Sequence, residues 1–217
     1  MMKKLSRHQR GFTIVELMIA TLVFSVILTV VTMGVISFSN RYYKGVHAST
    51  TQNTTRNIMD TITQAIQFGE ARVDPSGAND FFCAGGSVFM FDNNGVMYDG
   101  SVGQRGVYVT AKSGDACQNQ ALSNGRQMLG KRMRIASLSV SPVAGVDNMY
   151  RAQLVIAYGE DNVLCAPSLP QGCTASANYS SANFINRPDV RCKAGSGNQY
   201  CAVSRLIANV QKRVVPN

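Results

Sequence analysis

The sequence predicts an α+β protein in which one long N-terminal α-helix, membrane-spanning in its first half, packs on an antiparallel β-sheet with a disulfide-held C-terminal loop region. Three observations lead to this prediction. An apolar run of 27 residues follows a short basic N-terminus, β-prone runs occupy the middle of the chain, and all six cysteines lie after residue 80. With 217 residues, 45% of them hydrophobic, the chain has room for one folded domain beside such a helix.

The apolar run extends from Phe12 to Phe38 and contains a single charged residue, Glu16. As a helix it would rise roughly 40 Å, which is enough to cross a bilayer with some tilt. Four of the residues before it are basic and contribute to the formal charge of +9 (Lys3, Lys4, Arg7 and Arg10). Basic residues hold that end in the cytoplasm, so the sequence predicts a single pass with everything after about residue 40 on the far side.

The start of the run points to a particular kind of processing. An ordinary secretory signal has a shorter apolar core and a cleavage site of small residues on the exported side, and this segment has neither. The stretch G-F-T-I-V-E-L, from Gly11 to Leu17, instead resembles the type IV prepilin signature. The resemblance implies that a dedicated aspartyl peptidase cleaves after Gly11 and methylates the new N-terminus. Residues 1–11 would then be a leader, and Phe12 would become N-methylphenylalanine.

Glu16 is the residue of this segment that hydrophobicity does not explain. An unpaired carboxylate in hydrocarbon costs several kcal/mol, so it normally marks a partner. A plain single-pass anchor would give it none. The resemblance implies that Glu16 is an assembly residue that neutralises the Phe12 amine of an adjacent subunit, because two buried charges become tolerable as a pair. One departure is that many major pilins carry a proline in the apolar segment, whereas this chain has none and Met33-Gly34 is its only weak point.

The helix is expected to continue out of the membrane over residues 39–73, after an assembly segment of residues 12–38. Apolar residues recur at helical spacing in its later part, which predicts packing on a globular domain (Val46, Ile58, Met59, Ile62, Ala65 and Ile66). Gly69 is the expected end, with Asp74-Pro75 closing the helix off. A β-rich head then occupies residues 74–217.

Beyond residue 80 the sequence predicts strands. The stretch SVFMFDNNGVMYDG, residues 87–100, has two β-prone runs around Asn94-Gly95, a dipeptide that strongly indicates a hairpin. Further strands are expected within four later runs (residues 105–111, 131–143, 148–160 and 200–214). These runs favour one antiparallel sheet resting on the helix.

Six cysteines in the part predicted to be exported indicate disulfides rather than a metal site. Zinc sites use closely paired ligands such as C-x-x-C, and the closest spacings here have seven and eight intervening residues. About fifteen pairings are open. Pairing neighbours would join Cys165 to Cys173 and Cys192 to Cys201, and would leave Cys83 with Cys117. The stretch from about Cys165 to Tyr200 is rich in Pro, Ser, Asn and Gly and is predicted to be an irregular loop held by these bonds.

The order of these elements resembles the type IV pilin fold. More narrowly, the strands RIASLSVSPV and YRAQLVIAYGE and the closing IANVQKRVVPN resemble the PilW and GspJ group of minor pilins and pseudopilins. The resemblance implies a structural subunit that prepilin peptidase processes and that enters a type IV pilus or its initiation complex, in adhesion, motility or DNA uptake. Its partners would be other pilins, the peptidase, and an inner-membrane assembly platform with its ATPase. Its location would be the inner membrane before assembly, and the extracellular or periplasmic space in the filament.

The residues favour no enzyme. The only histidines are His8 in the leader and His47, which is expected to be solvated, so the cut chain would lack a His-centred triad or multi-histidine site. Oxygen-bearing residues around the predicted turn could bind calcium, but D-N-N-G is an ordinary turn and lacks the register of a calcium hand (Asp92, Asn93, Asn94 and Asp99). We therefore expect no cofactor and no metal.

Two alternative functions stay open. The first is a type II secretion pseudopilin of the GspJ kind, which would share every feature above. The second is a pilin that binds DNA or a surface through basic residues of the C-terminal loop (Arg187, Arg191 and Lys193). Scattered basic residues more often form a solvated face, so DNA binding is the lesser hypothesis.

Overall fold

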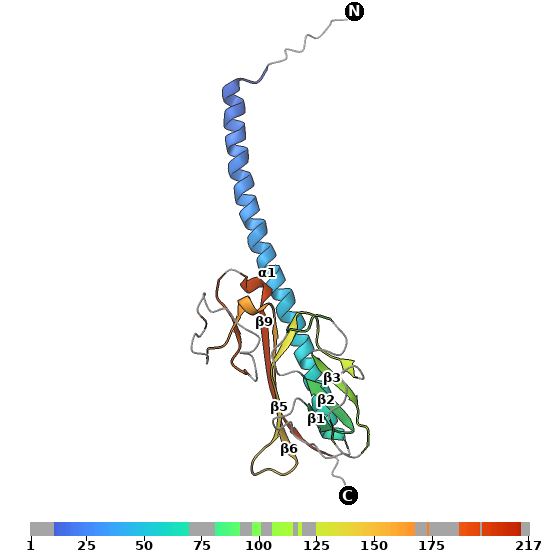
Figure 1. The fold of residues 1–217 in the computed structure, drawn as a ribbon. Helices are drawn as coiled ribbons and strands as arrows, with labels where there is room; N and C mark the ends of the chain where they lie inside the picture. The colour runs from blue at the N-terminus through green and yellow to red at the C-terminus, as the bar shows by residue number, and fades with distance from the viewer. Residues whose placement is uncertain are drawn as a thin grey trace, which may run out of the picture. The chain divides into compact units, whose positions relative to one another are not determined.

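The computed structural model describes residues 11–69, 81–91, 97–100, 106–114, 117–118, 125–167, 173, 187–195 and 197–213 of the chain. Within these ranges it contains one α-helix, α1 (Ile14–Phe68), and nine β-strands (Figure 1). The chain divides into two compact units, Met1–Tyr42 and Tyr43–Asn217, and the division falls within α1. The second unit holds all of the strands.

The part of α1 that belongs to the second unit is amphipathic. Its buried residues recur at three- and four-residue spacing and place one face against the strands (Thr51, Thr55, Ile58, Met59, Ile62 and Ile66). The packing predicted from the apolar spacing is therefore present, although Val46 is exposed. α1 ends at Phe68, directly before Gly69. The expected closure at Asp74-Pro75 and the domain boundary there lie outside the described residues.

Gly69 follows the helix for a reason beyond its conformational freedom. It lies against Gly85, in the turn between β1 (Phe81–Ala84) and β2 (Ser87–Phe91), and a Cβ at position 69 would come within 1.8 Å of the Gly85 Cα. Gly85 and Gly86 have φ angles of 57° and 78°, as a two-residue turn between antiparallel strands requires. The helix end and this turn therefore meet backbone to backbone.

The first sheet has four antiparallel strands in the order β1-β2-β3-β4, where β3 is Val107–Ala111 and β4 is Arg126–Gln127. The hairpin predicted around Asn94-Gly95 is wrong in its pairing, because β2 lies between β1 and β3 and residues 97–99 form no strand. Tyr98 is held elsewhere: its N–H donates to the Met133 carbonyl at 2.8 Å. Asn94-Gly95 itself lies outside the described residues.

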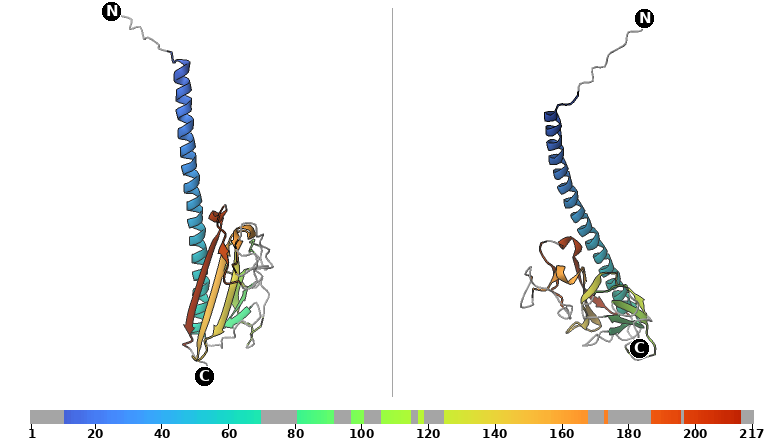
Figure 2. Two further views of the ribbon diagram at one scale, coloured as in Figure 1. Left: turned by 90° about the vertical axis from the view of Figure 1, so that its left-hand side faces the viewer. Right: turned by 45° about the horizontal axis from the view of Figure 1, so that its top comes forward.

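The second sheet consists of three ten-residue antiparallel strands in the order β5-β6-β9 (Met133–Pro142, Met149–Tyr158 and Ala202–Gln211). Each lies within a run predicted as a strand. The sequence favoured a single sheet, whereas the described strands form two larger sheets and a short pair of β7 (Leu164–Cys165) with β8 (Arg191–Cys192). Figure 2 shows the long strands running alongside the second half of α1.

One hydrophobic core joins α1 to both larger sheets. The helix contributes Ile58, Met59, Ile62 and Ile66 to this core. The strands contribute the apolar side chains of their inner faces (Phe82, Phe89, Phe91, Met133, Ile135, Leu138, Leu154 and Ile156). The Phe82 and Phe89 rings stack with their centroids 4.7 Å apart across β1 and β2. Burying each of these large side chains contributes about 1.5–3 kcal/mol, so this interface holds the second unit together.

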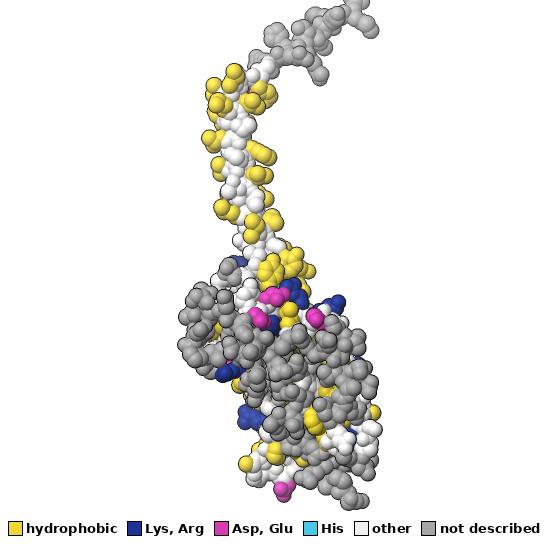
Figure 3. Space-filling model, viewed as in Figure 1, with side chains coloured by type: hydrophobic (Ala, Val, Ile, Leu, Met, Phe, Trp, Pro, Cys, Tyr) yellow, Lys and Arg dark blue, Asp and Glu magenta, His cyan; other side chains and the backbone are white. Residues whose placement is uncertain are grey.

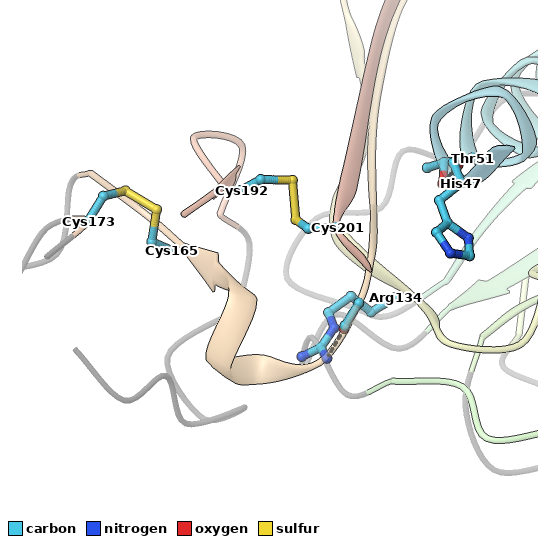
Figure 4. The surroundings of a disulfide bond; sticks show 8 residues. His47, Thr51, Arg134, Cys165, Cys173, Cys192 and Cys201 are labelled. Carbon is cyan, nitrogen blue, oxygen red and sulfur yellow. Dashed lines mark hydrogen bonds between the residues drawn. A yellow bond between two sulfur atoms is a disulfide. The ribbon is translucent and has the colours of Figure 1, made fainter. Parts of the chain in front are cut away.

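The cysteine-bearing C-terminal region covers part of the outer face of the β5-β6-β9 sheet. A second core forms there (Ala136, Val155, Ala157, Leu164, Cys165, Ala166, Val190 and Cys201). Three disulfides are present, and they are the pairs of the neighbour scheme (Cys83–Cys117, Cys165–Cys173 and Cys192–Cys201). Figure 4 shows the last two of them. Much of the predicted loop lies outside the described residues, and its described part includes β7, β8 and the short helix η4 (Asn198–Tyr200).

Candidate processing and assembly site

The first described residues form a short stretch in front of α1. Gly11, Phe12 and Thr13 have no regular secondary structure, and the Phe12 side chain is 85% exposed. The Gly11–Phe12 bond therefore lies in exposed chain before the first helical residue. The rest of the predicted leader lies outside the described residues.

Thr13 and Glu16 form a capping box at the start of α1. The Glu16 backbone N–H donates to the Thr13 hydroxyl at 3.2 Å, and the Glu16 carboxylate accepts from the Thr13 N–H at 3.1 Å and from its hydroxyl at 3.0 Å. This reciprocal pair satisfies backbone donors that a helix start otherwise leaves without a partner. This local role of Glu16 was not among the predictions from the sequence, although T-x-x-E before an apolar run is its signature.

The first part of α1 presents apolar side chains to its surroundings on every side. All residues from Gly11 to Phe38 are exposed, and Figure 3 shows hydrophobic side chains along the visible length of this part. An apolar surface of this extent needs a cover of lipid or of other apolar helices. Within the described ranges, α1 is the one helix long and apolar enough to span a membrane, with a mean hydropathy of 2.6 over its most apolar window.

Four of the hydroxyl groups in this apolar part donate to carbonyls of the helix itself. Thr21 and Ser25 donate to carbonyls three residues earlier, and Thr29 and Thr32 donate to carbonyls four residues earlier, at 2.7–2.9 Å. A polar group in hydrocarbon must find its partner inside the protein, and these hydroxyls have one. These four side chains are therefore compatible with a bilayer.

Aromatic side chains gather around His47, where α1 enters the head. The His47 ring stacks on Tyr158 of β6 with the centroids 4.3 Å apart, and it lies 6.4 and 6.5 Å from Tyr43 and Tyr200. The prediction that His47 is solvated is therefore wrong, since it is half-buried. Burial, and then the positive charge of Arg132, lower the pKa of His47. His47 is thus a neutral packing residue at neutral pH.

The three basic residues of the DNA-binding alternative differ in their access to solvent. Arg191 is exposed, Arg187 is half-buried, and Lys193 is buried. The backbone N–H of Arg187 donates to the Ala136 carbonyl, and that of Lys193 to the Val163 carbonyl. The three side chains consequently do not share one exposed surface.

An open polar groove of about 480 Å³ lies between α1 and β4 (Asn57, Asp60, Thr61, Gln64, Arg126, Gln127 and Met128). It contains one carboxylate and one guanidinium and neither histidine nor cysteine, so it offers hydrogen bonds rather than a nucleophile with its base. In the described part of the chain, no group of three or more His, Cys, Asp or Glu could hold a metal ion. The calcium candidates Asp92, Asn93 and Asn94 lie outside it.

Comparison with known proteins identifies the N-terminal segment. Residues 6–32 match the prokaryotic N-terminal methylation motif, a match that includes the Gly11–Phe12 bond and Glu16. No curated protein and no solved structure matches the chain. The chain therefore carries a type IV pilin-like prepilin signal, which indicates a structural subunit family whose members are cut by prepilin peptidase and assemble with other pilins. The long apolar helix, antiparallel sheets and three disulfides agree with the α+β type IV pilin fold.

Proposed function

We propose that this chain is a minor type IV pilin. It is inserted into the inner membrane as a precursor, cut after Gly11, methylated at Phe12, and built into a pilus or its initiation complex. The observation that carries the proposal is the motif match over residues 6–32, at the start of an apolar segment in which every residue from Gly11 to Phe38 is exposed. Neighbouring apolar helices would replace lipid around this helix in the filament. The head would supply the contacts specific to this subunit.

Glu16 has two roles in this proposal. Within its own chain it caps α1, and both bonds from Thr13 go to the same carboxylate oxygen, Oε2. A carboxylate has two oxygens and about four acceptor positions, so Oε1 can accept from another donor while the cap stays formed. The Phe12 amine of a neighbouring subunit is that donor in the proposed filament. The pairing would remove the cost of two separate charges in an apolar bundle.

Two substitutions separate the cap from the charge pair. Glu16→Gln keeps an acceptor for the Thr13 N–H, because glutamine also serves in capping boxes, but it removes the charge. Thr13→Val removes the hydroxyl and keeps the charge, at a cost of about 1 kcal/mol at the helix start. We expect Glu16→Gln to reduce incorporation into sheared filaments at least about tenfold and Thr13→Val much less, because an amine left unpaired among apolar helices costs more than a weakened cap.

The same filaments test the processing step. Mass spectrometry of the subunit's N-terminus should find cleavage after Gly11 and a methyl group on Phe12. Equal incorporation of Glu16→Gln and the parent would overturn the charge pairing, and an uncut precursor in cells with active peptidase would overturn the whole proposal. Co-purification with pilus subunits or with type II secretion components decides between a pilin and a pseudopilin.

A further inference from the structure

An exposed tyrosine lies close to the end of the apolar run. Tyr43 follows Phe38 by five residues in the continuous helix α1, which places it about 7.5 Å further along the helix axis. The headgroup layer on each side of the hydrocarbon is about 5–8 Å thick. With Phe38 at the hydrocarbon edge, Tyr43 lies in this layer.

The folded head brings a second exposed ring to the same place. Tyr200, from η4 near the end of the chain, lies 6.4 Å from Tyr43 between ring centroids. The two residues are 45% and 48% exposed. His47 lies 6.4 and 6.5 Å from the two rings and stacks on Tyr158, so both exposed rings adjoin a packed aromatic pair.

The residues around these rings have the character of a membrane interface. Lys44 follows Tyr43 and is exposed, and Arg132 is close enough to His47 for its charge to act on that ring. Figure 3 shows hydrophobic and basic side chains together where α1 enters the head, with acidic ones beside them. Tyrosine with lysine and arginine is the combination enriched at the border between hydrocarbon and water, because each has an apolar body and a polar tip.

We propose that Tyr43 and Tyr200 dock the folded head on the outer surface of the bilayer that α1 spans, with phospholipid headgroups as the occupant of this surface. The inference rests on the proposed membrane-inserted precursor and adds an interaction surface to it. Lipid is favoured over another protein because the apolar run that spans the bilayer ends at Phe38, only one to two helical turns before Tyr43. The head is then held at the lipid surface until the subunit is extracted into a filament.

The test uses the absence of tryptophan from the chain. Single tryptophans are introduced into the full chain in nanodiscs of phosphatidylethanolamine and phosphatidylglycerol, with or without lipid brominated high on its acyl chains. Tyr200→Trp and Tyr43→Trp report on docking. Val146→Trp is the matched control, because Val146 is 46% exposed and lies in the turn between β5 and β6, roughly 30 Å away at the other end of that sheet. Phe24→Trp reports on insertion of the apolar run.

Brominated lipid should lower the emission of Phe24→Trp, Tyr200→Trp and Tyr43→Trp at least about twofold and leave that of Val146→Trp unchanged, because only interfacial and buried rings meet the bromine atoms. Quenching of Phe24→Trp without quenching of either tyrosine variant would overturn the docking and leave the membrane-inserted precursor intact. No quenching of Phe24→Trp would overturn the inserted precursor itself. A shift of the Tyr200→Trp emission that grows with the number of chains per nanodisc, without quenching, would assign the surface to a second copy instead.

Discussion

Removing the charge of Asp161 is expected to destabilise the head by about 2 kcal/mol, whereas removing that of the adjacent Glu160 should cost well under 1 kcal/mol. Both carboxylates follow β6, and each pairs with an arginine near the start of β5, Asp161 with Arg134 and Glu160 with Arg132. The arginine side chains differ in exposure, with 1% for Arg134 and 55% for Arg132. The chain thus offers a buried and an exposed version of the same ion pair.

The expected loss of stability follows from the contacts that Arg134 keeps when Asp161 is replaced. Its guanidinium donates to the Asp161 carboxylate and, at 2.8 Å, to the Gly159 carbonyl. Asp161→Asn leaves the bond to the carbonyl but removes the counter-charge, and breaking a fully buried pair costs about 3–5 kcal/mol. Asp161 is itself 40% exposed, so water screens part of the pair and brings the expected cost to about 2 kcal/mol. Arg134→Met should cost less, because it leaves no buried charge behind.

The assay is urea unfolding of the full chain in nanodiscs, read by pulse proteolysis of the head. With a slope of about 2 kcal/mol per molar urea, Asp161→Asn should lower the midpoint by about 1 M, and Glu160→Gln should leave it nearly in place. Equal shifts for the two variants would refute the reasoning from burial. So would a larger shift for Arg134→Met than for Asp161→Asn.

Two further predictions concern pH and the disulfides. Burial lowers the pKa of His47, so below its ordinary value of 6.5 the unfolded chain binds a proton that the folded head does not, and the urea midpoint should fall as the pH drops from about 7.5 to about 5.5. His47→Gln should weaken this dependence, and an unchanged slope would count against it. Replacing Cys83 and Cys117 by serine opens a span of 34 residues and should cost about 3.8 kcal/mol, against about 2.6 kcal/mol for Cys192 and Cys201 with a span of 9. A reversed order of the two midpoints would contradict the chain-entropy argument.

Elements with long, regular patterns could be predicted from the sequence. The spacing of Ile58, Ile62 and Ile66 identified the packed face of α1, and the three ten-residue strands were expected within their runs. The hairpin predicted at Asn94-Gly95 was not correct. Gly85-Gly86 precedes β2 and Asn94-Gly95 follows it, and turn propensity alone does not decide which of the two dipeptides forms the hairpin turn. The Gly85-Gly86 turn pairs β1 with β2 and allows Phe82 to stack on Phe89, which is a tertiary gain that local sequence does not show.

Some features of the candidate site could likewise be predicted from the sequence, and others could not. The motif pointed to Gly11, Phe12 and Glu16 because the relevant residues are close together in sequence. The cap between Thr13 and Glu16 is equally local but was not predicted, because a partner in another subunit already accounted for the carboxylate. The burial of His47 could not be predicted, since its stacking partner Tyr158 becomes a neighbour only when β6 packs beside α1.

The second core has a consequence for anyone who produces this protein. The cysteine-bearing C-terminal region that packs on the outer face of β6 contains the disulfides Cys165–Cys173 and Cys192–Cys201. Thiols in a reducing cytoplasm do not form such bonds. A head expressed there would lack both bonds, which weakens the packing over Val155 and Ala157, and we expect more frequent exposure of this apolar surface and more self-association. A homogeneous sample therefore requires an oxidising host compartment or oxidative refolding.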